Sequence, residues 1–231
     1  MNDEERKKLP EVNCLPNKTK MIAAICINAL IFLFTVYGMS RFFTVGGDGN
    51  MTVMNTRCFQ FFTVDSNLLA ALASLLLLAA QIRYLRTGKI PPIQLIVLKL
   101  VGTTAVGVTF FTVFCFLGTL YGYKSMIVGV NLYMHLLTPL LAMIGFCFLE
   151  TQPAIRFRSV FLGLIPTILY GIVYMIMVVL QKRWMDFYGF NMGGHWKLSS
   201  VLMLAATFLI SLGLWALRRA LARKEARKQA E

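Results

Sequence analysis

Residues 57–86 read RCFQFFTVDSNLLAALASLLLLAAQIRYLR, and this stretch decides the class of protein. Its second half, 68–80, contains no charged side chain and consists mostly of Leu and Ala. The run is long enough to cross a bilayer, because about 20 helical residues span the ~30 Å hydrocarbon core. Four polar side chains nevertheless lie in its first half: Thr63, Asp65, Ser66 and Asn67. Polar groups inside a membrane are costly and mark a candidate functional site.

The composition of the whole chain agrees with a membrane protein. Of its 231 residues, 58% are hydrophobic, and the mean hydropathy is +0.68, whereas soluble domains are about 45–50% apolar. The net charge of +13 lies in loops and tails, so it indicates membrane topology and attraction to anionic headgroups, and we expect no nucleic-acid partner. The sequence implies no protein partner, and membrane lipids are the expected solvent and substrate.

We predict a single all-α domain with six transmembrane helices, at 21–43, 58–82, 93–120, 126–149, 159–180 and 198–217. The polar segments 1–20 and 218–231 form tails, the second as an extension of the last helix. Lys and Arg concentrate in these tails and in the loops 82–92 and 150–158, which places both termini in the cytoplasm of a plasma-membrane protein. Lys99, near the start of the third span, is expected to snorkel toward that side.

The second and fourth spans carry polar residues at matching depths in the outer half of the bilayer. Thr63 and Asn67 lie on one helix at positions i and i+4, and Asn131 and His135 have the same spacing on the other. Ser66 shares the face of Thr63, whereas Asp65 points toward another helix, the headgroups or Lys124. We therefore expect the two spans to contact each other.

The chemistry of this cluster suggests a nucleophile with its base. A Thr hydroxyl becomes reactive when a neighbouring base removes its proton, and His is the usual base. In this interpretation Thr63 attacks, His135 accepts the proton, and Asn67 donates to an oxyanion. In the alternative, these side chains only hold helices together by hydrogen bonds, which is common in membranes.

Two prolines and two glycines predict irregular helices. Pro139 follows His135 by four residues and removes the hydrogen-bond partner of the His135 carbonyl, so the fourth span should be distorted there, with Thr138 nearby. In the fifth span, Pro166 predicts a kink, and Gly163 and Gly171 predict close helix packing.

The outer loop at 184–196 reads WMDFYGFNMGGHW. It is interpreted either as a lid or entrance that contacts lipid chains, or as an aromatic anchor at the interface, the commoner use of such residues. The first interpretation adds Asp186, Tyr188 and Asn191 to the pocket candidates. The five Cys and two His have no metal-ligand spacing, so we expect no metal and no cofactor.

Three segments resemble a known family: FQFFTVDSNLLAAL at 59–72, NLYMHLLTPLLA at 131–142 and DFYGFN at 186–191. The chain resembles the six-transmembrane bacterial branch of the androgen-induced and androgen-dependent TFPI-regulating protein family. The resemblance implies a serine-hydrolase-like lipid esterase that cleaves fatty acid esters of hydroxy fatty acids. The family uses a Thr early in the second span and a His in the fourth, and these roles fall on Thr63 and His135.

The leading hypothesis is thus an intramembrane lipid-ester hydrolase, with Ser66 as the alternative nucleophile. A small permease or a lipid-binding protein could use the same cluster without catalysis. The inner halves of the second and fourth spans, 68–80 and 140–148, are almost entirely apolar. This composition favours a dead-end pocket over a path through the membrane.

Overall fold

The computed structural model describes residues 18–44, 54–150 and 154–230. The described residues form helices and no strands, and six helical spans are long and apolar enough to cross a membrane. The predicted all-α, multi-pass membrane protein is therefore confirmed. The six spans are Lys18–Phe43, Phe62–Thr87, Ile93–Tyr121, Leu132–Leu149, Ser159–Leu180 and Trp196–Arg227.

Three spans are single helices and three change their winding along their length. The single helices are α2 (Lys18–Phe43), α3 (Phe62–Thr87) and α10 (Trp196–Ala230). The third span joins α4 (Ile93–Thr112), η2 (Val113–Leu117) and α5 (Gly118–Tyr121). The fourth joins η3 (Leu132–Leu137), α7 (Thr138–Ile144) and η4 (Gly145–Leu149). The fifth joins α8 (Ser159–Leu162), α9 (Ile165–Met175) and η5 (Ile176–Leu180). Short helices η1 (Asn55–Gln60), α6 (Tyr123–Met126) and η6 (Met192–Gly194) lie between spans.

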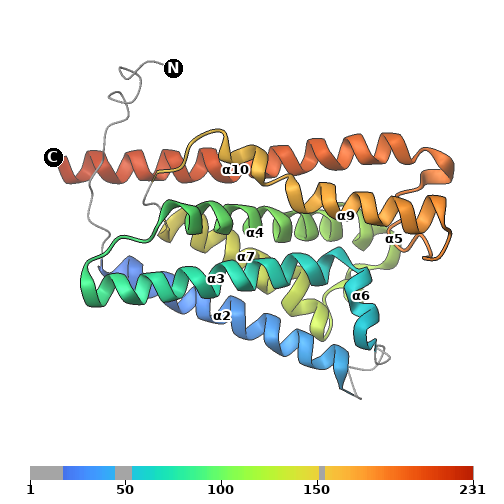
Figure 1. Ribbon diagram of the computed structural model, residues 1–231, viewed down its shortest axis with the longest axis horizontal. Helices are drawn as coiled ribbons and strands as arrows, with labels where there is room; N and C mark the ends of the chain where they lie inside the picture. Colours follow the sequence, from blue (N-terminus) through green and yellow to red (C-terminus); the bar gives the residue numbers. More distant parts are fainter. Residues whose placement is uncertain (1–17, 45–53, 151–153, 231) are drawn as a thin grey trace.

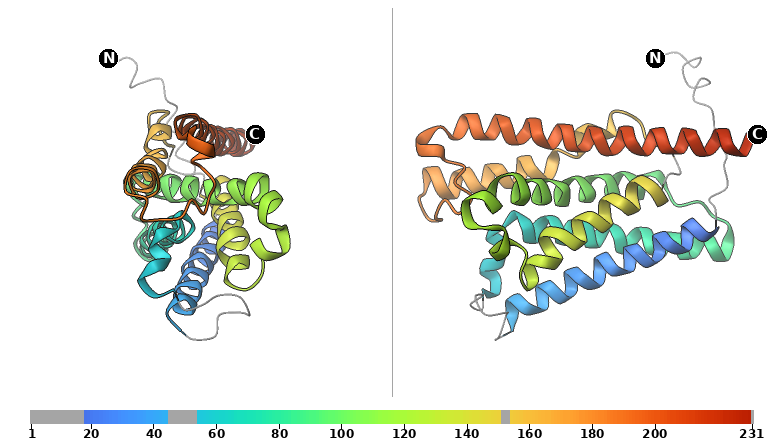
Figure 2. Two further views of the ribbon diagram at one scale, coloured as in Figure 1. Left: turned by 90° about the vertical axis from the view of Figure 1, so that its right-hand side faces the viewer. Right: turned by 180° about the vertical axis from the view of Figure 1, so that it is seen from behind.

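The bundle is built around α4, with α2, α3 and α7 on one side and α9 and α10 on the other (Figures 1 and 2). The helices α3 and α4 approach closely, because a Cβ added to Gly102 would lie 3.0 Å from the Cα of Ala70. By contrast, α9 and α10 bury few residues and present large apolar side chains on the outer surface. They are the most lipid-facing part of the bundle.

Both site-bearing spans begin later than the hydropathy pattern predicted. The second span begins at Phe62, because Asn55–Gln60 winds as a separate 3₁₀-helix, so Thr63 is the second residue of α3. The fourth span begins at Leu132, after the short helix α6. Both starts shift in the same direction, and Thr63 and His135 therefore remain near the same end of the bundle.

The inner half of the bundle is more polar than predicted. Lys99 does not snorkel: its side chain is fully buried and donates to Asn28 Oδ1 at 2.7 Å and to Ser74 Oγ at 2.6 Å. The amide of Asn28 in turn donates to Glu150 Oε1 at 2.6 Å. Arg218, assigned from sequence to the exposed tail, is also buried and donates to the Glu150 carbonyl at 2.7 Å. We call these five residues the inner polar network.

An apolar layer separates the inner polar network from the outer half of the bundle. It consists of four buried side chains, one from each of four spans: Ile31, Ala70, Val106 and Ala142. On α3, Ala70 lies between Asn67 and Ser74, and on α4, Val106 lies between Thr109 and Lys99. The described helices thus carry two polar levels with these four apolar side chains between them, and the buried Thr103 and Thr104 lie next to this level on α4.

The glycines of the fifth span play different roles. A Cβ on Gly163 would lie 2.4 Å from Ser211 Oγ, so the predicted close packing is confirmed at this position. Around Gly171 there is no atom within 4 Å of such a Cβ, and the prediction of close packing is wrong there. The span breaks just before Pro166, which occupies the first turn of α9 as predicted.

Candidate active site

Thr63 and His135 meet at the outer end of the bundle. Thr63 Oγ1 lies 3.4 Å from His135 Nε2, and the two residues come from α3 and η3, far apart in the sequence. His135 is buried, and Thr63 is partly buried. The distance exceeds the ~2.6–3.2 Å of a formed catalytic hydrogen bond, but such bonds commonly tighten only when substrate binds. The pair predicted from the sequence is thus in contact.

A backbone carbonyl fixes the proton of the His135 ring. His135 Nδ1 lies 2.7 Å from the carbonyl oxygen of Met126, at the end of α6. Because a carbonyl can only accept a hydrogen bond, Nδ1 carries the proton of the neutral ring. The other nitrogen, Nε2, then presents its lone pair to the Thr63 hydroxyl. This is the tautomer that a general base requires.

Asn67 and Ser66 hold the backbone around Thr63. The Asn67 amide nitrogen donates to the Thr63 carbonyl at 2.7 Å and to the Met134 carbonyl at 3.1 Å. An amide has two N–H donors, so both are committed to the backbone and the predicted oxyanion contact has no donor left. Ser66 is buried, donates to the Thr63 carbonyl and pairs with Thr109 Oγ1 at 2.9 Å.

The other polar residues of the two spans lie around this pair. Asn131 donates to the carbonyl of Ser125 at 3.1 Å and closes the turn before η3. Thr138 is buried where the π-helical segment ends, just before Pro139, so the predicted distortion is present. Asp65 lies in the first turn of α3, where a carboxylate interacts favourably with the helix dipole.

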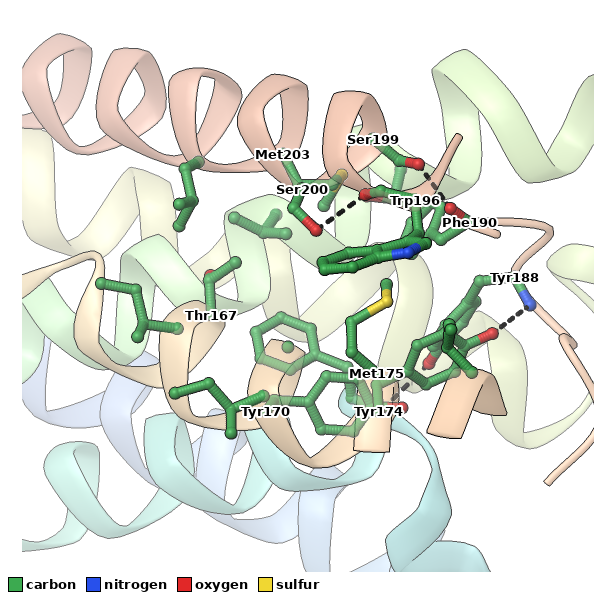
Figure 3. Close-up of a pocket in the computed structure, with 18 of the residues that line it drawn as sticks. Thr167, Tyr170, Tyr174, Met175, Tyr188, Phe190, Trp196, Ser199, Ser200 and Met203 are labelled. Carbon is green, nitrogen blue, oxygen red and sulfur yellow. Dashed lines mark hydrogen bonds between the residues drawn. The ribbon is translucent and has the colours of Figure 1, made fainter. Parts of the chain in front are cut away.

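Thr63 also borders an apolar chamber of about 380 Å³. The chamber lies between α4, α9 and α10, and Figure 3 shows Tyr170, Tyr174 and Tyr188 on one side of it with Trp196 across from them. Its size falls within the ~300–1,000 Å³ of small-molecule sites. Of the predicted site residues, Thr63 and Tyr188 line it. Its wall also includes Ile168, Ile172 and Leu180, which are exposed on the lipid-facing surface.

The outer loop folds back onto the start of α3. The carboxylate of Asp186 accepts hydrogen bonds from the Tyr174 hydroxyl at 2.7 Å and from the backbone N–H groups of Phe190 and Asn191, both at 2.9 Å. Asp186 therefore shapes the loop, and it is not among the residues that line the chamber. Tyr188 is buried, and its hydroxyl accepts the Phe62 N–H at 2.9 Å. The anchor interpretation is thus wrong for Tyr188, which belongs to the site.

Sequence reasoning missed Tyr170 and Tyr174. They form one face of the chamber with Tyr188, at ring-centroid distances of 5.9 Å between Tyr170 and Tyr174 and 5.5 Å between Tyr174 and Tyr188. Their i, i+4 spacing in an otherwise aliphatic span was the available signal.

No match was found when the chain was compared with protein-family models, with curated proteins and with solved structures. Among the described residues, no group of three or more His, Cys, Asp or Glu side chains is placed to hold a metal ion.

Proposed function

We propose that this protein is an intramembrane hydrolase of lipid esters. The observation that carries the proposal is the Thr63–His135 contact at the edge of an apolar chamber, with the His135 tautomer fixed by the Met126 carbonyl. The same two residues take the catalytic roles in the androgen-induced and androgen-dependent TFPI-regulating protein family, which the sequence resembles. The site lies in the outer half of a plasma-membrane protein whose termini are cytoplasmic.

The reaction proceeds by acyl transfer to Thr63. The Thr63 oxygen forms a bond to the ester carbon while its proton passes to His135 Nε2, and the carbonyl electron pair moves to the oxygen. The pair then returns, the bond to the alcohol breaks, and the alkoxide takes the proton from His135. Water attacks the acyl-threonine in the same way: His135 takes a proton from the water and returns it to Thr63 as the fatty acid leaves.

The apolar lining of the chamber favours a substrate with an acyl chain that enters from the bilayer. It is lined by aliphatic and aromatic side chains from the two lipid-facing helices α9 and α10. An acyl chain that enters between these helices exchanges one apolar environment for another, so it crosses no aqueous phase. Thr63 and Tyr188 are the polar groups at the α3 end of this chamber, where an ester group would come to rest.

The apolar layer argues against the permease alternative. A transport path from the outer cluster must pass the level of Ile31, Ala70, Val106 and Ala142, whose side chains are all buried in one apolar cluster. The inner polar network could contribute polar groups to such a path, but it lies on the other side of this layer from Thr63 and His135. A pocket that is closed at one end suits an esterase or a lipid-binding protein. Only the esterase would hydrolyse its ligand, so a measurement of hydrolysis distinguishes the two.

The test uses purified protein in lipid nanodiscs with a fluorophosphonate probe and a fatty acid ester of a hydroxy fatty acid. Wild type, Thr63→Val, Thr63→Ser and His135→Ala are compared. Thr63→Val keeps the side-chain shape without the hydroxyl, and we expect it to abolish probe labelling. Thr63→Ser should keep it, and His135→Ala should lower turnover by about 10²–10⁴-fold.

Ser66→Ala is the matched control, because Ser66 lies one turn from Thr63 but does not line the chamber. Labelling that survives in Thr63→Val and disappears in Ser66→Ala would move the nucleophile to Ser66. Folded wild-type protein that is neither labelled nor active refutes the hydrolase, and the site would then be a lipid-binding site or a purely structural contact.

A further inference from the structure

The Thr63–His135 pair leaves one requirement of acyl transfer unassigned. When Thr63 adds to the ester carbon, the carbonyl oxygen becomes negatively charged, and a fixed donor that stabilises this charge usually contributes most to the rate. Asn67, the residue predicted for this role, gives both amide hydrogens to backbone carbonyls. A side chain that borders both Thr63 and the chamber can supply this donor instead.

Three tyrosines line that side of the chamber (Figure 3), and the hydroxyl hydrogens of two of them are donated to other acceptors. The Tyr170 hydroxyl donates to the Gln60 carbonyl at 2.6 Å, and the Tyr174 hydroxyl donates to the Asp186 carboxylate at 2.7 Å. The Tyr188 hydroxyl is placed differently, because its oxygen accepts the Phe62 N–H at 2.9 Å. A phenol that accepts a hydrogen bond through its oxygen keeps its own hydrogen to donate.

The position of Tyr188 is fixed from several directions. Its backbone N–H donates to the Tyr174 hydroxyl at 3.2 Å, and its ring packs against Phe187 at 4.7 Å and Phe190 at 5.4 Å between centroids. Its hydroxyl is anchored by the N–H of Phe62, the residue before Thr63, and both Tyr188 and Thr63 line the chamber. A donor held in place before reaction pays no reorganisation cost when the charge develops.

We propose that Tyr188 is a catalytic residue that donates its O–H to the oxyanion formed when Thr63 adds to the ester carbonyl. The inference rests on the proposed hydrolase. No proton is transferred from Tyr188: the Thr63 proton goes to His135, and the phenol keeps its hydrogen throughout. The hydrogen bond forms as negative charge develops on the oxygen of the carbon that Thr63 has attacked, and it breaks when that carbonyl reforms.

The raised pKa of Tyr188 keeps its hydroxyl neutral, as a hydrogen-bond donor requires. Burial raises the pKa of Tyr188 to about 12, although the contacts with Phe62, Tyr170 and Thr63 oppose this rise. The phenol is therefore protonated at every pH at which His135 can act as a base. The role of Tyr188 is hydrogen-bond donation and not general acid catalysis.

The experiment compares Tyr188→Phe with Tyr170→Phe and Tyr174→Phe in full-length protein in nanodiscs. All three variants lose one hydroxyl at the same wall of the same chamber. Tyr170→Phe is the matched control, whereas Tyr174→Phe also removes the acceptor of the Tyr188 backbone N–H and measures how far the placement of Tyr188 matters. We expect kcat of Tyr188→Phe to fall by about 10²–10³-fold, as after loss of an oxyanion donor elsewhere, with KM within about threefold. Fluorophosphonate labelling should slow by a similar factor but still reach Thr63. Tyr170→Phe should lose less than about tenfold.

Two outcomes overturn the inference while leaving the hydrolase intact. In the first, kcat of Tyr188→Phe stays near that of active wild type. In the second, the three variants lose activity equally, which is the result of a purely structural role. Inactive and unlabelled wild type instead removes the proposed function, and this inference with it.

Replacement of residue 188 by 3,5-difluorotyrosine covers the case in which Tyr188→Phe fails to fold. This residue keeps the hydroxyl but makes it a more acidic donor. The inference predicts a larger change in kcat for this protein than for the protein with the same replacement at Tyr170. Equal changes in kcat at the two positions overturn it.

Discussion

Asn67 holds α3, which carries Thr63, against η3, which carries His135. Its amide joins the Thr63 carbonyl within α3 to the Met134 carbonyl on η3, next to His135. The π-helical winding of Leu132–Leu137 displaces the usual backbone pairing, which allows a side chain to reach a carbonyl there. Asn67 therefore positions Thr63 and His135 relative to each other.

Asn67→Ala should destabilise the protein and weaken the site. Two buried carbonyls would lose a donor, at about 1–3 kcal/mol each, so we expect a loss of about 2–4 kcal/mol. Asn131→Ala is the control, because Asn131 donates to the carbonyl of Ser125, which is exposed, and water can replace the bond. Thermal unfolding in detergent measures both variants. Equal stability of the two would show that Asn67 does not connect the helices.

At the scale of the element, sequence periodicity predicted which residues share a face of one helix, but it did not predict the hydrogen bonds between different helices. The i, i+4 pairs and the matching depth of two spans placed Thr63 beside His135, because both spans start at the same membrane surface. On the other span, the partner of Asn67 is the backbone carbonyl of Met134. Every residue has such a carbonyl, so a pattern of side chains cannot predict which one is used. The fold-back of Tyr188 likewise depends on aromatic packing with no regular spacing.

Replacement by Ala should change stability in opposite directions at two glycines. Gly102 lies at the contact between α3 and α4, and Gly171 lies on α9. Gly102→Ala places a methyl group 3.0 Å from the Ala70 Cα, and backbone cannot move aside as a side chain can. We expect a loss of about 1–3 kcal/mol from this overpacking. Gly171→Ala meets no atom within 4 Å and should stabilise α9 by up to about 1 kcal/mol, because Ala favours helix over Gly.

Thermal unfolding of the two glycine variants, side by side with wild type, measures this prediction. An unchanged melting temperature in Gly102→Ala would mean that α3 and α4 can separate without cost. The catalytic pair would then not depend on their close approach.

At the scale of the whole molecule, the protein stacks two polar levels with different tasks. The outer level contains Thr63 and His135 at the chamber, and the inner level ties α2, α3, α4, η4 and α10 together through Lys99 and its partners. A hydropathy pattern treats each span separately, so it predicted that Lys99 would turn to the surface. Its partners lie on other spans, and only the assembled bundle brings them to it.

Because these two levels are separate, we predict that a substitution at Lys99 lowers the stability of the protein but leaves its activity nearly unchanged. Lys99→Met removes the buried donor to Asn28 Oδ1 and Ser74 Oγ and leaves both acceptors without it inside the bundle. We expect a loss of about 2–4 kcal/mol, because an unsatisfied buried polar group costs about 1–3 kcal/mol. Lys89→Met, at an exposed loop position, should change stability by less than about 0.5 kcal/mol.

Activity should not follow the loss of stability in Lys99→Met. The apolar layer of Ile31, Ala70, Val106 and Ala142 insulates the outer site, so fluorophosphonate labelling per folded molecule should stay within about twofold of wild type. The measurement is made well below the melting temperature of the variant, so that unfolded protein does not contribute. Labelling that disappears while the variant remains folded would show that the inner polar network acts on the catalytic pair through the apolar layer, and the network would then belong to the mechanism.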